Sequence, residues 1–211
     1  MVDSVIACRR CQRLTEFRAS IKQNFPDYYC LPVDSFGDDL ARLLIVGLAP
    51  GMHGANATGR AFTGDASGNL LFETLYKYGF ANKASSVSLD DGMRLKSCRI
   101  TNAVKCLPPQ NKPSNEEIGQ CNRFLRQEIE SLPAGSIILA LGVIAHKAVV
   151  KALDLPQISY RFSHHAQHRF PADLTLVDSY HCSRYNTQTR RLTKDMFEQV
   201  FADIRMRLDR G

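Results

Sequence analysis

The chain has 211 residues, 44% of them hydrophobic, which suits one globular domain with a core that needs no disulfide framework. Its 27 Lys and Arg exceed its 21 Asp and Glu, and the resulting formal charge of +6 favours a polyanionic partner if the excess lies on one face. The N-terminus has no signal-peptide-like apolar run and no segment reaches about 18 apolar residues, so we expect a cytoplasmic protein with no membrane span.

Strands and helices are predicted to alternate along the chain. A cysteine-bearing segment of about residues 1–20 and a loop-like stretch rich in Pro and Asp precede them. Short continuous apolar runs predict buried strands, and apolar residues at helical spacing predict helices. The expected strands cover 43–48, 98–105, 136–142 and 174–181. The expected helices cover 67–78, 114–132, 143–153 and 192–208.

Two helices carry further local signals. Ser114 and Glu117 have capping-box spacing, and the last helix places Met196, Val200, Ile204 and Leu208 on one stripe. The alternation predicts an α/β fold, a three-layer α/β/α sandwich with a central, mainly parallel four-stranded sheet. Function should then lie beyond the carboxyl ends of the strands, in the segments 47–68, 102–113 and 181–191.

The seven cysteines favour metal ligation over disulfides, because the count is odd and the expected compartment is reducing. Cys8 and Cys11 form a CxxC pair, which zinc sites and redox sites also use. One loop and one helical turn can bring Cys106 and Cys121 together, although Cys121 can also be read as a small core residue. Four thiolates suit an iron–sulfur cluster or a structural zinc, and their spacing leaves both open.

The segment that follows the first expected strand reads GLAPG, then HGANATGRAFTGDASG. Together with the CxxC pair, TNAVKCLPPQNKP and HCSRYNTQTRRLT, it resembles the uracil-DNA glycosylases of the iron–sulfur class over nearly the whole chain. Leu48 stands where type-a relatives carry an acidic residue, so the resemblance is closest to the type-b (family 5) branch. It implies one domain over residues 1–211 and a [4Fe–4S] cluster. The implied ligands are Cys8, Cys11, Cys106 and Cys121.

The resemblance also implies a pocket that receives a flipped base. Phe62 would stack on the base, and Asn102 would read its edge because an amide both donates and accepts. The alternatives are an ordinary core aromatic and an Asn that bonds local backbone. His181, with backbone N–H groups around Gly47 and Leu48, would stabilise the negative charge that develops on the departing base.

Asp65 is the candidate catalytic carboxylate. It can hold or deprotonate the attacking water and stabilise the cationic sugar, and it can equally serve as the N-cap of the helix that follows. The three histidines His164, His165 and His168 are expected to be polar loop residues, since their spacing does not indicate a metal site.

The run SRYNTQTRRL is a candidate DNA-binding loop, with a charged, solvated loop as the alternative. Arg184, Arg190 and Arg191 can contact phosphates, and Tyr185 can wedge into the gap left by a flipped base. In the related family, Pro is usual at the position of Cys182 and Gly is common at that of Arg190.

The first functional hypothesis is a monomeric, monofunctional DNA repair glycosylase that hydrolyses the N-glycosidic bond of uracil in DNA, and of hypoxanthine or xanthine as further substrates. The second is a non-catalytic iron–sulfur DNA-binding module. A zinc-stabilised nucleotide-binding domain is the third, and it would be colourless.

Overall fold

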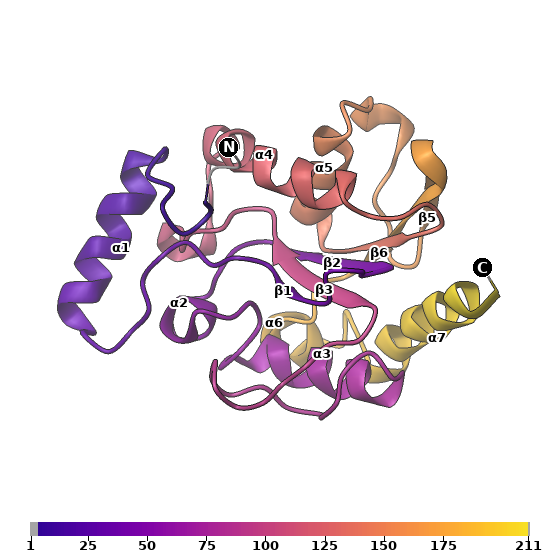
Figure 1. Cartoon of the computed structure of the whole chain (residues 1–211), viewed down its shortest axis with the longest axis horizontal. Helices are drawn as coiled ribbons and strands as arrows, with labels where there is room; N and C mark the ends of the chain where they lie inside the picture. The colour runs from indigo at the N-terminus through magenta and orange to yellow at the C-terminus, as the bar shows by residue number, and fades with distance from the viewer. Residues whose placement is uncertain (1–3, 211) are drawn as a thin grey trace.

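A six-stranded sheet forms the middle layer of the protein (Figure 1). The structure, a computed structural model, describes residues 4–210, so the ends of the expected domain, residues 1–3 and 211, lie outside it. The strand order is β1-β3-β2-β4-β6-β5. The bounds are β1 (Phe36–Gly37), β2 (Leu43–Gly47), β3 (Cys98–Asn102), β4 (Ile137–Leu141), β5 (Gln167–Phe170) and β6 (Leu174–Ser179).

The four predicted strands are confirmed as the parallel centre of this sheet. They are β3, β2, β4 and β6, and each pairs in parallel with its neighbour. The expected total of four strands is wrong, because β1 and β5 add antiparallel edges. The strand predicted over 98–105 ends at Asn102, beyond which Ala103 and Val104 donate backbone hydrogen bonds to Gly47 and Leu48 outside the regular ladder.

Helices cover both faces of the sheet, which confirms the three-layer arrangement (Figure 1). In β2, Leu43 and Ile45 face the core shared with α3 and α7, while Leu44 and Val46 face the core shared with α4 and α5. This alternation follows from the period of two in a strand. The long helices are α3 (Ala66–Lys77), α4 (Asn115–Glu130), α5 (Val143–Ala152) and α7 (Lys194–Arg210).

The start of α4 and the buried face of α7 agree with their sequence signals. The Ser114 and Glu117 capping box at the start of α4 is confirmed in both directions. The predicted stripe on α7 is also confirmed, since Val200, Ile204 and Leu208 are buried and Met196 packs, partly buried, against the same core. The short elements are α2 (Ala55–Thr58), α6 (Arg184–Gln188) and the 3-10 turns 109–111, 157–159 and 171–173.

One long helix was not predicted. Helix α1 (Gln12–Asn24) begins in the cysteine-bearing segment and lies apart from the sheet, and its Leu14 packs with Val104 of the loop after β3 and Phe124 of α4 (Figure 1). It buries Leu14, Arg18 and Ile21, too few apolar residues to give a clear helical pattern. Among the described residues, no helix is both long and apolar enough to cross a bilayer.

Candidate active site

A cavity of about 330 Å³ opens where β2, β3 and β6 end, at the edge predicted to carry function. That volume is sufficient for a small planar ligand. The cavity brings together five of the predicted site residues: Leu48, Phe62, Asp65, Asn102 and His181. Its other lining residues are Ala49, Gly51, Ala55, Ser67, Asn111 and Ser183.

Gly47 is not among the residues that line the cavity, but its lack of a side chain makes room for two residues that are. A Cβ added at Gly47 would lie 2.4 Å from Asn102 Oδ1 and 2.6 Å from Phe62 Cζ. Only a glycine therefore lets the amide and the aromatic ring approach the end of β2. Both side chains are almost fully buried, at 3% exposed for Asn102 and 6% for Phe62.

Replacing Gly47 by Ala should displace both Phe62 and Asn102. We expect kcat/KM for the reaction of this site to fall on the order of 10²-fold, because shifts of about 1 Å have that effect in positioned sites. The matched control is Gly119→Ala in α4, where an added Cβ meets only the flexible end of Lys151 at 3.1 Å. Steady-state kinetics on both variants checks this, and equal activity of the two would contradict it.

Asp65 caps a helix and also borders the cavity. Its Oδ1 accepts hydrogen bonds from the N–H groups of Ser67 at 2.9 Å and Gly68 at 3.1 Å, so it caps α3. Its Oδ2 faces the loop at Gly54, where an added Cβ would lie 2.5 Å away. Burial raises the pKa of Asp65, while the two backbone donors oppose that rise. The carboxylate is thus fixed by the helix and still borders the cavity.

The rings of His181 and Phe62 both line the cavity and are stacked on each other. Their ring centroids are 5.9 Å apart, with planes inclined by 23°. Burial lowers the pKa of His181 to about 4, so the imidazole is neutral at physiological pH. A neutral imidazole still carries one N–H that can donate to an oxygen in the cavity.

Phe62 also has a left-handed backbone conformation, with φ at 58°. A buried aromatic residue rarely adopts this conformation, and it is found where surrounding structure holds it in place. Here Gly68 provides the space, because a Cβ at that position would lie 1.8 Å from the Phe62 carbonyl oxygen.

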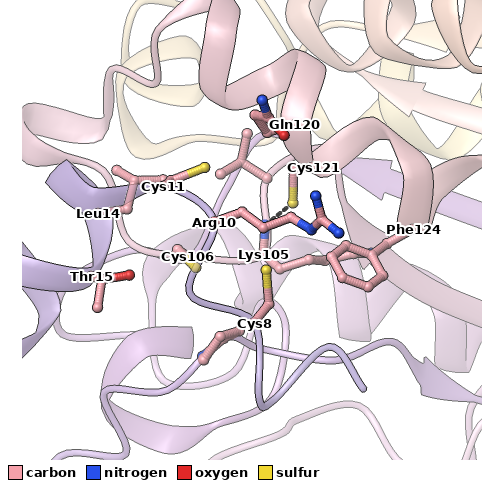
Figure 2. A pocket seen from close by; sticks show the side chains of 12 residues that line it. Cys8, Arg10, Cys11, Leu14, Thr15, Lys105, Cys106, Gln120, Cys121 and Phe124 are labelled. Atoms are coloured by element: carbon pink, nitrogen blue, oxygen red, sulfur yellow. Dashed lines mark hydrogen bonds between the residues drawn. The ribbon is translucent and has the colours of Figure 1, made fainter. Parts of the chain in front are cut away.

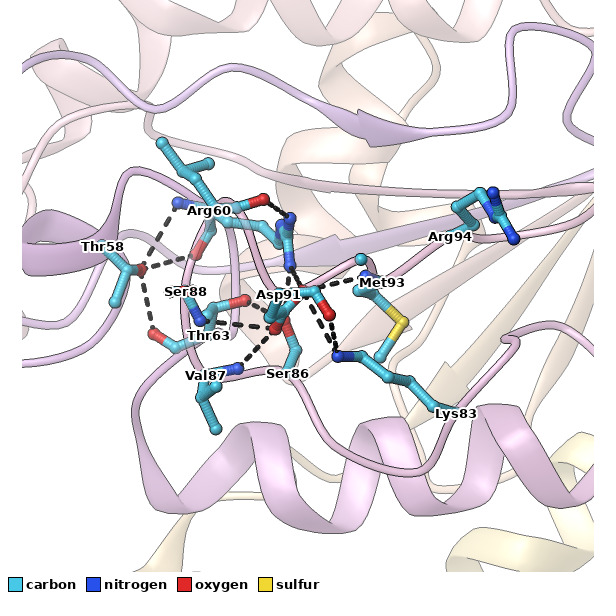
Figure 3. A network of polar contacts seen from close by, with 12 residues as sticks. Thr58, Arg60, Thr63, Lys83, Ser86, Val87, Ser88, Asp91, Met93 and Arg94 are labelled. Atoms are coloured by element: carbon cyan, nitrogen blue, oxygen red, sulfur yellow. Dashed lines mark hydrogen bonds and ion pairs between the residues drawn. The ribbon is translucent and has the colours of Figure 1, made fainter.

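A buried polar network fixes the loop that carries Phe62 and Asp65 (Figure 3). Arg60 Nη1 donates to Asp91 Oδ1 at 2.7 Å and to Ser86 Oγ at 2.9 Å, and Thr63 and Ser86 share a hydroxyl hydrogen bond of 2.8 Å. Although burial acts to raise it, the Arg60 guanidinium and the backbone N–H groups of residues 87, 88 and 93 hold the pKa of Asp91 well below its usual range. The segment 82–96 is therefore locked against the loop beside the cavity.

Sequence reasoning missed Asn111, Ser67 and Ser183 as lining residues. Asn111 has a φ of 56°, and an Asn shortly before Lys-Pro is a turn signal that could have placed it in a tight loop. The segment 102–111 consequently touches the cavity at both ends, through Asn102 and Asn111, with Cys106 between them.

The candidate DNA-binding loop follows the cavity residue His181. Its four predicted contact residues are all exposed: Arg184, Tyr185, Arg190 and Arg191. Tyr185 is 72% exposed at the start of α6. The guanidinium of Arg191 lies 4.7 Å from the ring centroid of Tyr180, in a cation–π contact. Cys182 is buried, and its thiol donates to the Ser67 carbonyl at 3.4 Å, so it ties this loop to α3.

Arg190 has a φ of 58°, a conformation that glycine adopts without steric cost. Arg190→Gly should therefore raise the free energy of unfolding by about 0.5–1 kcal/mol, since relieved strain exceeds the added entropy of the unfolded chain. Denaturant unfolding checks this. The control Arg184→Gly replaces another exposed Arg of the same loop and should give no gain; a gain there, or none at position 190, would contradict the argument.

The cysteines predicted as ligands line one small pocket, where α1, the loop after β3 and α4 meet (Figure 2). Its apolar surroundings include Leu14, Val104 and Phe124. Burial raises the pKa of Cys106 to about 11 and that of Cys121 to about 12. The four-cysteine site consists of Cys8, Cys11, Cys106 and Cys121.

Although burial favours neutral thiols in the four-cysteine site, a backbone donor and a buried cation act in the opposite direction and favour thiolates. The Lys105 backbone N–H donates to Cys121 Sγ at 3.2 Å. Arg18 is buried, and its Nε and Nη2 have no hydrogen-bond partner among the described residues. Its positive charge opposes the effect of burial on the pKa of Cys106. N–H donors and a fixed cation around sulfur are features that tune iron–sulfur sites.

Four cysteine thiolates suit an iron–sulfur cluster or a structural zinc ion. The Lys105 N–H on Cys121 and the buried Arg18 beside Cys106 are consistent with the cluster. The donor set therefore fits the [4Fe–4S] cluster.

Comparison with known proteins agrees with these features. The family model of the uracil DNA glycosylase superfamily matches residues 35–205. A type-5 uracil-DNA glycosylase of Thermus thermophilus is 43% identical over 209 residues, which cover 97% of this chain and 95% of the relative. Another, from Pyrobaculum aerophilum, is 40% identical over 94% of this chain and 88% of its own length.

A type-4 uracil-DNA glycosylase of Archaeoglobus fulgidus matches less fully, at 30% identity over 74% of this chain and 64% of the relative. This ranking agrees with the type-b assignment that Leu48 suggested. By sequence over nearly its full length, the chain belongs to the uracil DNA glycosylase superfamily, in its type-5 branch.

Proposed function

We propose that this protein removes uracil from DNA by hydrolysing the N-glycosidic bond, which leaves an abasic site. The observation that carries the proposal is the cavity at the strand ends, which joins a flat ring, an amide, a carboxylate and a neutral imidazole. Those four groups are what base capture and glycosidic cleavage require. The type-5 relatives are named for the same activity.

Recognition of the base falls to Phe62 and Asn102. The Phe62 ring offers a flat apolar face for stacking, and the buried Asn102 amide offers one donor side and one acceptor side to the uracil edge. The pair is fixed by the close approach at Gly47. Pre-fixed polar groups cost little reorganisation when the base enters.

Cleavage of the bond falls to Asp65 and His181. Positive charge builds on the sugar and negative charge on the departing base, so a carboxylate on one side and an N–H donor on the other stabilise the transition state. Asp65, held by the N-terminus of α3, would orient the attacking water and accept its proton. Neutral His181 would donate its N–H to the base oxygen.

The exposed loop around α6 would contact DNA. Arg184, Arg190 and Arg191 would neutralise phosphates, and Tyr185, at 72% exposed, would enter the stack from which the nucleotide leaves. Because His181 lies three residues before Arg184, these contacts would be coupled directly to the cavity.

We further propose that the four-cysteine site holds a [4Fe–4S] cluster. When bound, it would supply an inorganic cross-link between the N-terminal segment and the loop after β3. Cys106 lies midway between Asn102 and Asn111, which both line the cavity, so anchoring Cys106 fixes that segment against the base. This placement favours a structural role over redox work.

The pH profile should show no titration of His181 near pH 6.5, where an ordinary histidine titrates. The pKa of Asp65 is raised above 3.8, so activity falls with decreasing pH as this carboxylate becomes protonated. The pKa of His181 is lowered to about 4, so it stays neutral above that pH. We expect kcat/KM to vary little around pH 6.5 and to fall at acidic pH. An inflection near 6.5 that His181→Asn abolishes would contradict this.

A substrate panel tests the proposed function. Duplex oligonucleotides that differ only in one base, uracil, hypoxanthine, xanthine or thymine, are incubated with the protein and then treated with alkali to cleave abasic sites. We expect strand breaks at uracil. The deaminated purines are the proposed extension of the range, and thymine is the negative control. A gel shift without breaks at any deaminated base would indicate the non-catalytic DNA-binding module instead.

A further inference from the structure

A second group of metal-ligating side chains lies outside both the cavity and the four-cysteine site. It joins His146 of α5, His168 of β5 and Asp178 of β6, whose ligand atoms all lie within 4.8 Å of one another. Asp178 is fully buried and His146 is 1% exposed. The expectation that His168 is a loop residue is wrong, because β5 pairs His168 with Leu176 and brings it beside Asp178.

The atoms of this group are left partly unpaired. His168 Nε2 and Asp178 Oδ2 are both buried, and neither has a hydrogen-bond partner among the described residues. They face each other at 3.5 Å. A buried carboxylate oxygen without a donor is costly, so such a pair needs a cation or a proton between its members. Two ligands of tetrahedral zinc, each about 2.1 Å from the ion, lie roughly 3.4 Å apart.

The orientation of His146 fits the same interpretation. Its Nε2 lies 2.9 Å from the Tyr160 carbonyl oxygen, which can only accept, so this nitrogen carries a proton. Its Nδ1 makes a hydrogen bond of 2.8 Å with Asp178 Oδ1, so a proton lies between these two atoms and would leave when a metal binds. A metal-ligating histidine commonly donates its second N–H to a backbone carbonyl in this way. Phe162, at 5.7 Å from the His146 ring, adds an apolar wall.

We propose that His146 Nδ1, His168 Nε2 and the Asp178 carboxylate bind one divalent transition-metal ion, with zinc as the best match. Two imidazoles and one carboxylate are suitable zinc donors, and water would complete a tetrahedron. Binding releases any proton held between Asp178 and the two rings. The ion would join α5 to the edge strand β5 and to β6, three residues before His181. The proposal does not depend on the glycosylase activity.

Zinc and iron are measured together in the purified holoprotein after incubation with zinc and removal of free metal. We expect about one zinc per chain without loss of iron. His168→Ala should weaken zinc uptake more than 10-fold. The control His165→Ala removes a neighbouring histidine that pairs with Asp203 at 2.9 Å, and should keep the zinc.

The melting temperature of the wild-type protein is a second measurement, which does not depend on whether a variant folds. Zinc at about 100 times its dissociation constant should raise the melting temperature by roughly 5–10 °C, because it binds the folded state alone. Zinc that replaces iron, that survives in His168→Ala, or that is not taken up by the wild-type chain would overturn the proposal.

Discussion

Asp65→Asn should lower the rate of uracil excision about 10³-fold, in the range expected when a positioned general base is lost. The substitution keeps the size of the side chain and an oxygen that can accept from Ser67 and Gly68, and Asn is as good an N-cap as Asp. The helix should therefore stay capped and the cavity keep its shape. Single-turnover cleavage on a uracil oligonucleotide gives the rate, and a gel shift gives the affinity.

The control for this experiment is Asp91→Asn. Asp91 is another buried carboxylate near the same loop, but it pairs with Arg60 and does not line the cavity. We expect Asp91→Asn to lower stability more than chemistry, and Asp65→Asn to do the reverse while DNA binding persists. Full activity of Asp65→Asn would remove its catalytic role and leave it as a helix cap.

Cys106→Ser should destabilise the protein before it changes the chemistry. Loss of a ligand would release the proposed cluster, and because metal binding is coupled to folding, we expect a loss of more than about 3 kcal/mol in the free energy of unfolding. For a chain of this size, that corresponds to roughly 6–12 °C in melting temperature. Calorimetry and the iron content of the same sample measure both effects.

Cys98→Ala is the matched control. Cys98 is fully buried in β3 but lies outside the four-cysteine site, so we expect a cost near 1 kcal/mol and an unchanged iron content. A Cys106→Ser protein that is free of iron, as stable as wild type and fully active would refute the structural role of the cluster.

The central strands could be predicted because burial on both faces requires continuous apolar runs, as in LLIV of β2 and IILAL of β4. The two edge strands could not be predicted from the sequence. Strand β5 reads QHRF and has one buried residue, and β1 has only two residues. These strands form because a neighbour offers unpaired backbone groups, which no local pattern records. Helix α1 was not predicted because only two of its three buried residues are apolar, and the third is Arg18.

The candidate site was predictable where it depends on the ends of parallel strands. Asn102 and His181 lie just where β3 and β6 lead into loops, and Phe62 and Asp65 follow β2 within a glycine-rich segment. The structure places all four on one cavity. Asn111 was missed because its position depends on how the loop after Cys106 folds back.

Pairs far apart in sequence were also beyond prediction. Arg60 and Asp91 are 31 positions apart, and His146 and Asp178 are 32 apart. Each pair becomes visible only when the loops or strands are assembled, since a single His or Asp has no pattern that names its partner. The group formed by His146, His168 and Asp178 could therefore be recognised only from the fold.

Direct detection of free uracil tests the account most simply. The wild-type protein is incubated in excess with a duplex that contains one uracil, and the released base is quantified by mass spectrometry together with the abasic strand. We predict one uracil released per duplex and an equal amount of abasic DNA. Stable DNA binding with no released uracil would contradict the account and leave a DNA-binding module.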